Sequence, residues 1–308
     1  MIITPSVVEL GAAIVLVAAA AGIAVPTAVH RYRHRRFTAT TSAHQVLRDS
    51  HASWLVDHAV KVLAQACAWE PRLVPGVVMV VLHDDAISLH LSTPTAHPPA
   101  PWRNSADGLV WSATLLELQS QPLSPETANP FTGLITLGVS DAGRVFVDLG
   151  QAHGLVSIGG DLLSRHRVTA RWIAEAASRP WAAGQPTLVG LGDAATPRPT
   201  PESTLDELVD RVASGSVGIA FVESLPDDVA AGLLVQGLES HACRLPVVVA
   251  SHVASARWRF TAHANGWVTS DFLPAARWNP DAAALPAPAA AAGLATAPPA
   301  SSPAGITS

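Results

Sequence analysis

The stretch Leu155-Val156-Ser157-Ile158-Gly159-Gly160-Asp161, which runs into Leu162–Ala177, decides the fold. Its first four residues predict a short buried strand, and the apolar residues after Asp161 recur at helical spacing. A strand, a glycine-bearing loop and a helix together form a natural anion site, because the free N–H groups and the dipole of the helix N-terminus favour negative charge. The stretch therefore predicts an α/β domain and marks this loop as the first candidate site.

The loop itself lacks the residues that bind phosphate. A phosphate loop has the pattern G-x-x-x-x-G-K-[ST], in which glycines let the backbone wrap the phosphates, lysine supplies charge and a hydroxyl binds Mg²⁺. Counted from Gly159, these three places hold Ser164, Arg165 and His166. Asp161 adds a negative charge beside any phosphate. The order of elements fits a nucleotide site, but the chemistry does not.

Working outward, strands and helices alternate on both sides of this stretch. We expect strands at 187–191, 217–222 and 246–250, helices at 204–213 and 228–241, and hairpins at 134–139/145–149 and 258–261/267–269. Thr204 and Glu207 form a capping box at the start of their helix. Nearly continuous apolar strands between helices predict a mostly parallel sheet.

A smaller α+β unit precedes this domain. A helix is expected at 43–66, a hairpin at 77–82/86–91 and a further strand near 109–111. In the helix, Trp54 belongs to the predicted apolar side, with Asp57 and Lys61 opposite.

Histidines recur every seven residues along the edge of this helix, at His44, His51 and His58. Neighbours at this spacing lie ~10.5 Å apart along the axis, which is too far for one metal ion. They either border a packed face or sense pH.

The N-terminal sequence indicates where in the cell the protein lies. Leu10–Val29 is an uncharged, mostly apolar run that is long enough to span a bilayer once, and basic residues follow it at once. Because positive charge stays on the cytoplasmic side, we expect the N-terminus outside the cell and the remainder in the cytosol. The flanking arginines that would attract anionic lipid are Arg31, Arg33, Arg35 and Arg36. A cleaved signal peptide is the alternative, although the basic n-region that it needs is missing.

Four segments follow from these patterns: an anchor with its flank (1–36), the small α+β unit (37–120), the larger domain (131–279), and an Ala/Pro tail (280–308) predicted to be disordered. The net charge of -5 argues against a broad nucleic-acid-binding face. Cys67 and Cys243 stand in no metal-ligand spacing, and neither a metal nor a cofactor is expected.

The larger domain also resembles a known family. Leu137-Gly138, Asp141, Gly143 and Val147-Asp148-Leu149, followed by the strand that ends at Gly159, resemble the approach to the phosphate loop in FtsK/SpoIIIE-type translocase domains and related secretion ATPases. The arrangement is also similar to the middle region of actinobacterial membrane-anchored regulators with LysM or transcriptional-activator modules. Val217–Glu223 then corresponds to an apolar strand that ends in acidic residues, and Val247–Ser251 to a sensor strand.

The resemblance implies a nucleotide-hydrolase ancestry, and the missing motifs imply that the activity is lost. The vestigial nucleotide positions are Gly159, Gly160, Arg165 and Glu223, and we assign no catalytic residue. We predict a membrane-anchored, non-catalytic cytosolic interaction or regulatory module, with the lipid bilayer and an unidentified protein as partners. The alternatives are an ATP-hydrolysing FtsK-like motor-type domain and a secreted or surface protein.

Overall fold

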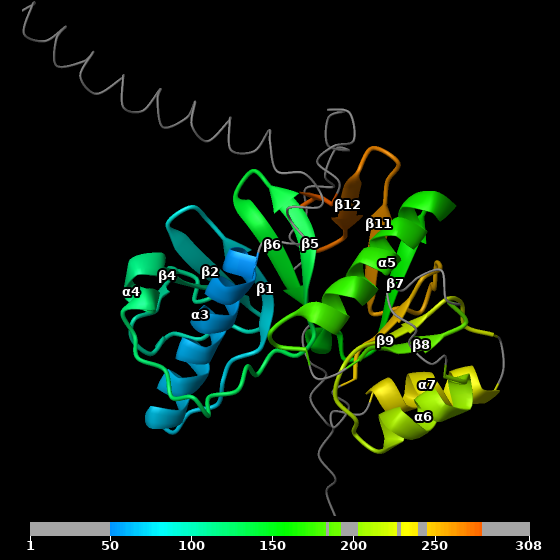
Figure 1. Cartoon of the computed structure of the whole chain (residues 1–308), viewed down its shortest axis with the longest axis horizontal. Helices are drawn as coiled ribbons and strands as arrows, with labels where there is room; N and C mark the ends of the chain where they lie inside the picture. The colour runs from blue at the N-terminus through cyan, green and yellow to red at the C-terminus, as the bar shows by residue number, and fades with distance from the viewer. Residues whose placement is uncertain (1–49, 183–184, 192–202, 227–228, 240–244, 279–308) are drawn as a thin grey trace, which may run out of the picture. The chain divides into compact units, whose positions relative to one another are not determined.

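The computed structural model describes residues 50–182, 185–191, 203–226, 229–239 and 245–278. Within these ranges, thirteen strands form one mixed sheet, in the order β3-β4-β2-β1-β6-β5-β13-β12-β11-β7-β10-β9-β8 (Figure 1). None of the helices in this part of the chain is both long and apolar enough to cross a bilayer. The predicted anchor with its arginines, His44 and the tail 280–308 lie outside the described residues.

The first half of the sheet is antiparallel. Its strands are β1 (Val77–Leu82), β2 (Ala86–Leu91), β3 (Arg103–Asn104), β4 (Val110–Thr114), β5 (Leu134–Ser140) and β6 (Gly143–Asp148). The two hairpins predicted in this half, β1–β2 and β5–β6, are confirmed. β1 also pairs with β6, so the strands of the predicted small unit and of the larger domain share one sheet.

The second half contains β7 (Leu155–Gly160), β8 (Thr187–Val189), β9 (Ala220–Val222), β10 (Val247–Val249), β11 (Trp258–Ala262), β12 (Trp267–Ser270) and β13 (Ala276–Arg277). Only the neighbours in β11-β7-β10-β9-β8 pair in parallel, and the other paired strands are antiparallel. The α/β class is confirmed, but the sheet is mixed, and the parallel pairing expected throughout the larger domain is confined to these five strands. Parallel pairs need long crossover connections, whereas short turns between strands produce antiparallel pairs.

The helices are α3 (Ser50–Trp69), α4 (Leu115–Gln119), α5 (Leu162–Ser178), α6 (Leu205–Ala213) and α7 (Val229–Glu239), with a 3-10 turn η1 (Leu149–Ala152). The predicted capping box is confirmed, because Thr204 accepts from the N–H of Glu207 and the Glu207 carboxylate accepts from the N–H of Thr204. α3 packs on β1, β2 and β4, and α6 and α7 pack on β9 and β10 (Figure 1).

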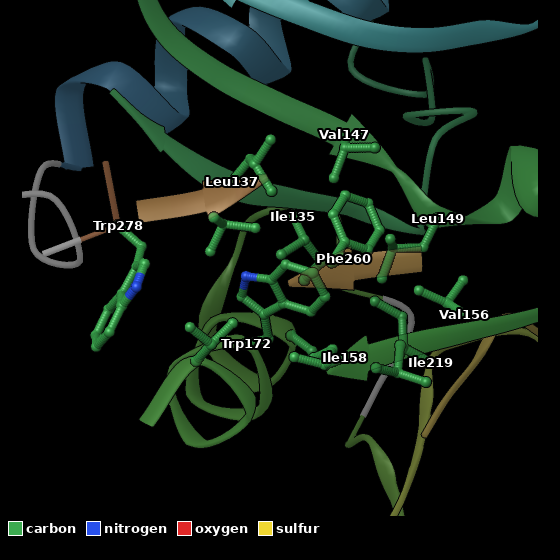
Figure 2. Packing of buried hydrophobic residues seen from close by; sticks show 14 of the residues in the cluster. Ile135, Leu137, Val147, Leu149, Val156, Ile158, Trp172, Ile219, Phe260 and Trp278 are labelled. Atoms are coloured by element: carbon green, nitrogen blue, oxygen red, sulfur yellow. The ribbon is translucent and has the colours of Figure 1, made fainter. Parts of the chain in front are cut away.

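The central core fixes α5 on the sheet. Trp172 of α5 meets Phe260 of β11 edge to face, with ring centroids 5.5 Å apart. Figure 2 shows both rings among Ile135, Val147 and Ile158, which come from three different strands. The indole N–H of Trp172 also donates to the carbonyl of Thr136 at 3.2 Å. This packing determines where the N-terminus of α5 lies above the end of β7.

The predicted orientation of α3 is wrong at two residues. Trp54 is 46% exposed, whereas Asp57 is buried. Asp57 accepts hydrogen bonds from Lys61 Nζ at 2.7 Å and from Asn129 Nδ2 at 3.0 Å. The side chain of Asn129 comes from a distant loop, so the helical pattern alone gave no sign that a carboxylate at this position would be satisfied in the interior.

Candidate functional site

The candidate site lies where the strand order of the parallel segment reverses. The connection from β7 leads to β8 at one edge of the sheet, whereas the connection from the neighbouring β10 leads to β11 on the other side of β7. Ligands of open α/β sheets bind in the crevice beyond the carboxyl ends of strands at such a point. The relevant residues therefore follow β7, β9 and β10.

The two glycines of the predicted loop belong to β7 itself. Gly159 lies opposite Thr261, and Gly160 lies opposite Ala262 of β11. Gly160 has φ +109°, and a Cβ at this position would lie 2.0 Å from the carbonyl oxygen of Ala262. The backbone of β11 thus occupies the space beside Gly160. This explains the glycine by close strand packing rather than by phosphate binding.

The N-terminus of α5 is occupied by the chain's own carboxylate. Asp161 is the N-cap, and its Oδ1 accepts the backbone N–H of Ser164 at 3.0 Å. Hydrogen bonds from the N–H and hydroxyl of Ser164 hold the pKa of Asp161 below its ordinary value. A carboxylate therefore sits where a helix dipole would otherwise favour a phosphate.

The residues that replace the phosphate-loop motif do not form a cationic pocket. Leu162 and Leu163 are 59% and 58% exposed at the first turn of α5. Arg165, which stands at the lysine place, is half-buried, and its Nε–H finds no acceptor among the described residues. The backbone N–H of Arg165 donates to the Asp161 carbonyl at 3.0 Å, as the first regular bond of the helix. The first turn of α5 therefore presents this apolar pair to solvent.

The loop after β10 fastens onto β7. The hydroxyl of Ser157 donates to the carbonyl of Ser251 at 3.0 Å and accepts the N–H of Val253 at 3.2 Å. His252 of the same loop approaches Gly159, since its Nδ1 lies 3.9 Å from the place of a Cβ there. These contacts bring the 251–253 loop over the end of β7.

Glu223 follows β9 and is exposed. Its backbone N–H donates to Val189 at 3.0 Å, and its carboxylate lies beside Gly190, 3.8 Å from the place of a Cβ there. Glu223 directly follows β9, and β10 lies between β9 and β7. Glu223 therefore lies two strand spacings, about 9.6 Å, from β7. The structure brings Gly159 and Gly160 together but joins neither Arg165 nor Glu223 to them by a hydrogen bond or ion pair among the described residues.

Sequence reasoning missed a buried charged network on α5. Glu175 is 1% exposed and accepts from the N–H and hydroxyl of Thr136 and from Arg179 Nε at 3.0 Å. Arg171, also buried, donates to the Trp278 carbonyl, and desolvation lowers its pKa to about 10. The i,i+4 spacing of Glu175 and Arg179 was the available signal, although such a pair is usually at the surface.

Asp148 is a second acidic residue whose burial the sequence did not indicate. It caps η1, between β6 and β7, and accepts from Gly150 N at 3.1 Å and from Gln151 Nε2 at 3.4 Å. Burial raises the pKa of Asp148 to about 6, and these two donors oppose the rise. Asp148 ends β6 and caps the turn that leads to the start of β7, away from the C-terminal ends of the parallel strands, so we assign it to the fold rather than to a ligand.

Comparison with known proteins leaves the family open. No family model matches the chain, and no curated protein sequence matches it. A solved structure of the pCW3 conjugation coupling protein TcpA, in its monomer form with ATPγS, matches with a TM-score of 0.23 and 11% sequence identity. The match covers 66% of this chain and 82% of that one. Within the described residues, no group of three His, Cys, Asp or Glu side chains is placed to hold a metal ion.

Proposed function

We propose that this chain is a single-pass membrane protein whose cytosolic α/β domain is non-catalytic and serves as an interaction or regulatory module. The proposal rests on the packing and capping at the C-terminal end of β7. There, Gly160 is packed against Ala262 and the helix N-terminus is capped by Asp161. A degenerate P-loop-like domain with this geometry has kept the order of elements while losing the phosphate site.

Three features each remove something that a nucleotide phosphate requires. The Ala262 carbonyl fills the space beside the glycine backbone, Asp161 takes the helix N–H that would face an oxyanion, and Leu162–Leu163 replace polar and small residues. A bound phosphate would need β7 to separate from β11 and Asp161 to leave its cap. Both changes cost free energy before any contact with the ligand is made.

Nucleotide titration of the purified full chain tests the lost activity. We expect no saturable binding of ATP or GTP, with or without Mg²⁺, in a fluorescence titration with labelled nucleotides. Saturation at micromolar nucleotide that unlabelled ATP reverses would contradict the proposal.

The proposed location rests on Leu10–Val29 and the arginines after it. A reporter enzyme fused after residue 60 is expected to be active only when the reporter functions in the cytosol. Activity confined to the outside of the cell would favour the secreted or surface alternative and would refute the proposed topology.

An active nucleotide hydrolase is the second candidate, because Glu223 is an exposed carboxylate at the C-terminal edge of the parallel strands, where no cation among the described residues pairs with it. In that case Arg165 would contact phosphate and Glu223 would act on water. Glu223→Gln would then abolish Mg²⁺-dependent turnover, whereas the matched change Glu239→Gln, at the end of α7, would not. Turnover that both variants retain would exclude this role of Glu223.

A further inference from the structure

The other residues that the structure describes leave one narrow side of α3 uncovered. Twelve of the sixteen residues from 52 to 67 are buried, and the four exceptions recur three or four positions apart, so they share one helix face. We call this face the α3 strip, and it consists of His51, Trp54, His58, Lys61, Ala64 and Ala68. It runs for about 26 Å along the helix axis.

The strip is held in a defined shape by its own rings. Trp54 stacks between His51 and His58, with ring centroids 6.2 Å and 5.1 Å away. The Nε2–H of His58 donates to the carbonyl of Leu118 at 2.9 Å, which ties α4 to this side of α3. α4 adds Leu116, which is 78% exposed. A partly exposed indole and an exposed leucine therefore lie on neighbouring helices.

The charges near the strip balance in pairs. Lys61 bonds to Asp57 within α3, and Arg103 bonds to Glu117 on α4. No acidic side chain belongs to the strip itself, so no unbalanced negative charge would repel an anionic surface. Indole and imidazole rings with an apolar body and a polar edge are suited to the boundary between lipid headgroups and water.

The position of the strip along the chain identifies its occupant. Ser50 begins α3, and residues 37–49 join it to the basic flank of the proposed anchor. Even a fully extended chain of this length reaches only about 45 Å. The flank residues Arg31, Arg33, Arg35 and Arg36 would gather anionic lipid within that reach.

We propose that the α3 strip and Leu116 lie against the headgroup region of the same bilayer, with anionic lipid as the partner. This inference rests on the proposed membrane anchor. It makes α3 an interfacial helix whose opposite side is built into the core of the domain, so that membrane contact orients the whole sheet. The exposed end of α5 would then be left to protein partners.

Depth-dependent quenching on the full chain tests the contact. The chain, carrying Cys243→Ser, is reconstituted into vesicles of phosphatidylcholine and phosphatidylglycerol, with an environment-sensitive fluorophore on Leu116→Cys. The matched control places the same fluorophore on Leu233→Cys of α7, a site that is also exposed and apolar. We expect lipids with a spin label near the headgroup to quench the Leu116 site severalfold more than the Leu233 site. Adding Trp54→Ser should reduce that difference.

Equal quenching at the two sites would overturn the inference. A second result would also overturn it: in lipid-free detergent, the Leu116 fluorophore is shielded from water, and this shielding grows with protein concentration. In that case a second copy of the chain would cover the strip. Carbonate extraction of the same vesicles reports on the anchor separately. Protein that resists carbonate extraction but shows no selective quenching would refute only the membrane contact of the strip. Protein that carbonate extracts but that shows selective quenching would refute the anchor and leave the membrane contact of the strip standing.

Discussion

The substitution Gly160→Ala tests whether this glycine serves strand packing or a phosphate loop. The added methyl group would lie 2.0 Å from the Ala262 carbonyl oxygen, well inside the 3.5–4.0 Å of an ordinary contact, so β7 and β11 would have to part by about 1 Å or more. An alanine at φ +109° also carries backbone strain of about 1–3 kcal/mol. Overpacking against a backbone atom adds about 1–3 kcal/mol.

The structure provides a matched control for the strain. Gly218 has φ +125°, and among the described residues a Cβ there would meet only Leu245 Cδ1, at 3.9 Å. Gly218→Ala should therefore lower the free energy of unfolding by the strain alone, about 1–3 kcal/mol. Gly160→Ala should lower it by about 2–6 kcal/mol, a large part of the 5–15 kcal/mol typical of a domain.

Urea unfolding of the purified full chain, followed by tryptophan fluorescence, measures the difference between the two variants. If Gly160→Ala and Gly218→Ala unfold at the same urea concentration, Gly160 is not packed against β11 as described. The explanation of the glycine by strand packing would then be refuted, and an open loop at this place would again be tenable. A wild-type midpoint for Gly160→Ala would refute it more strongly.

Three further predictions concern the interior and the α3 strip. Glu175→Ala should lower the free energy of unfolding by about 3–5 kcal/mol, because it leaves buried arginines without their carboxylate. Lys61→Ala removes a partly exposed ion pair and should lower it by at most about 1 kcal/mol. Similar losses for the two variants in urea unfolding would contradict this prediction. Burial raises the pKa of Asp148 to about 6 in the folded state, so the folded state binds this proton more tightly than the unfolded state does. The free energy of unfolding should therefore fall by up to about 3 kcal/mol as the pH rises from about 4 to 6. Asp148→Asn should flatten this pH profile. Trp172→Ala should cost about 3–5 kcal/mol, whereas Trp54→Ala should have a small effect in detergent; equal losses would show that Trp54 is packed in solution.

Local features of the fold could be predicted from the sequence. The β1–β2 and β5–β6 hairpins, the start of α5 at Leu162 and the capping box of Thr204 all match their predictions. Each depends on residues within a few positions of one another, through turn chemistry, alternation or capping. The strands β3 and β13 are only two residues long, which is too short for any periodic pattern to indicate them.

The candidate site could be predicted in part. The missing phosphate-loop chemistry is visible in the order of Ser164, Arg165 and His166. That Gly160 is a strand residue against Ala262, and that Asp161 caps the helix, follows only from the pairing of β7 with β11. These two strands are separated by about a hundred residues of chain, so no local pattern reports their register.

The sequence by itself determined the alternation of strands and helices, the absence of a phosphate-loop motif and the predicted anchor, because each is set by composition and short-range spacing. Only the tertiary structure decided which strands are parallel, that Asp57 and Glu175 are buried with partners, and that Trp54 faces outward. Helical spacing defines a face but not its neighbour, and a charged side chain can be buried only where distant residues supply its hydrogen bonds. The loop that first suggested an enzyme is thus the end of a strand, and the side of α3 left uncovered is the surface from which we infer membrane contact.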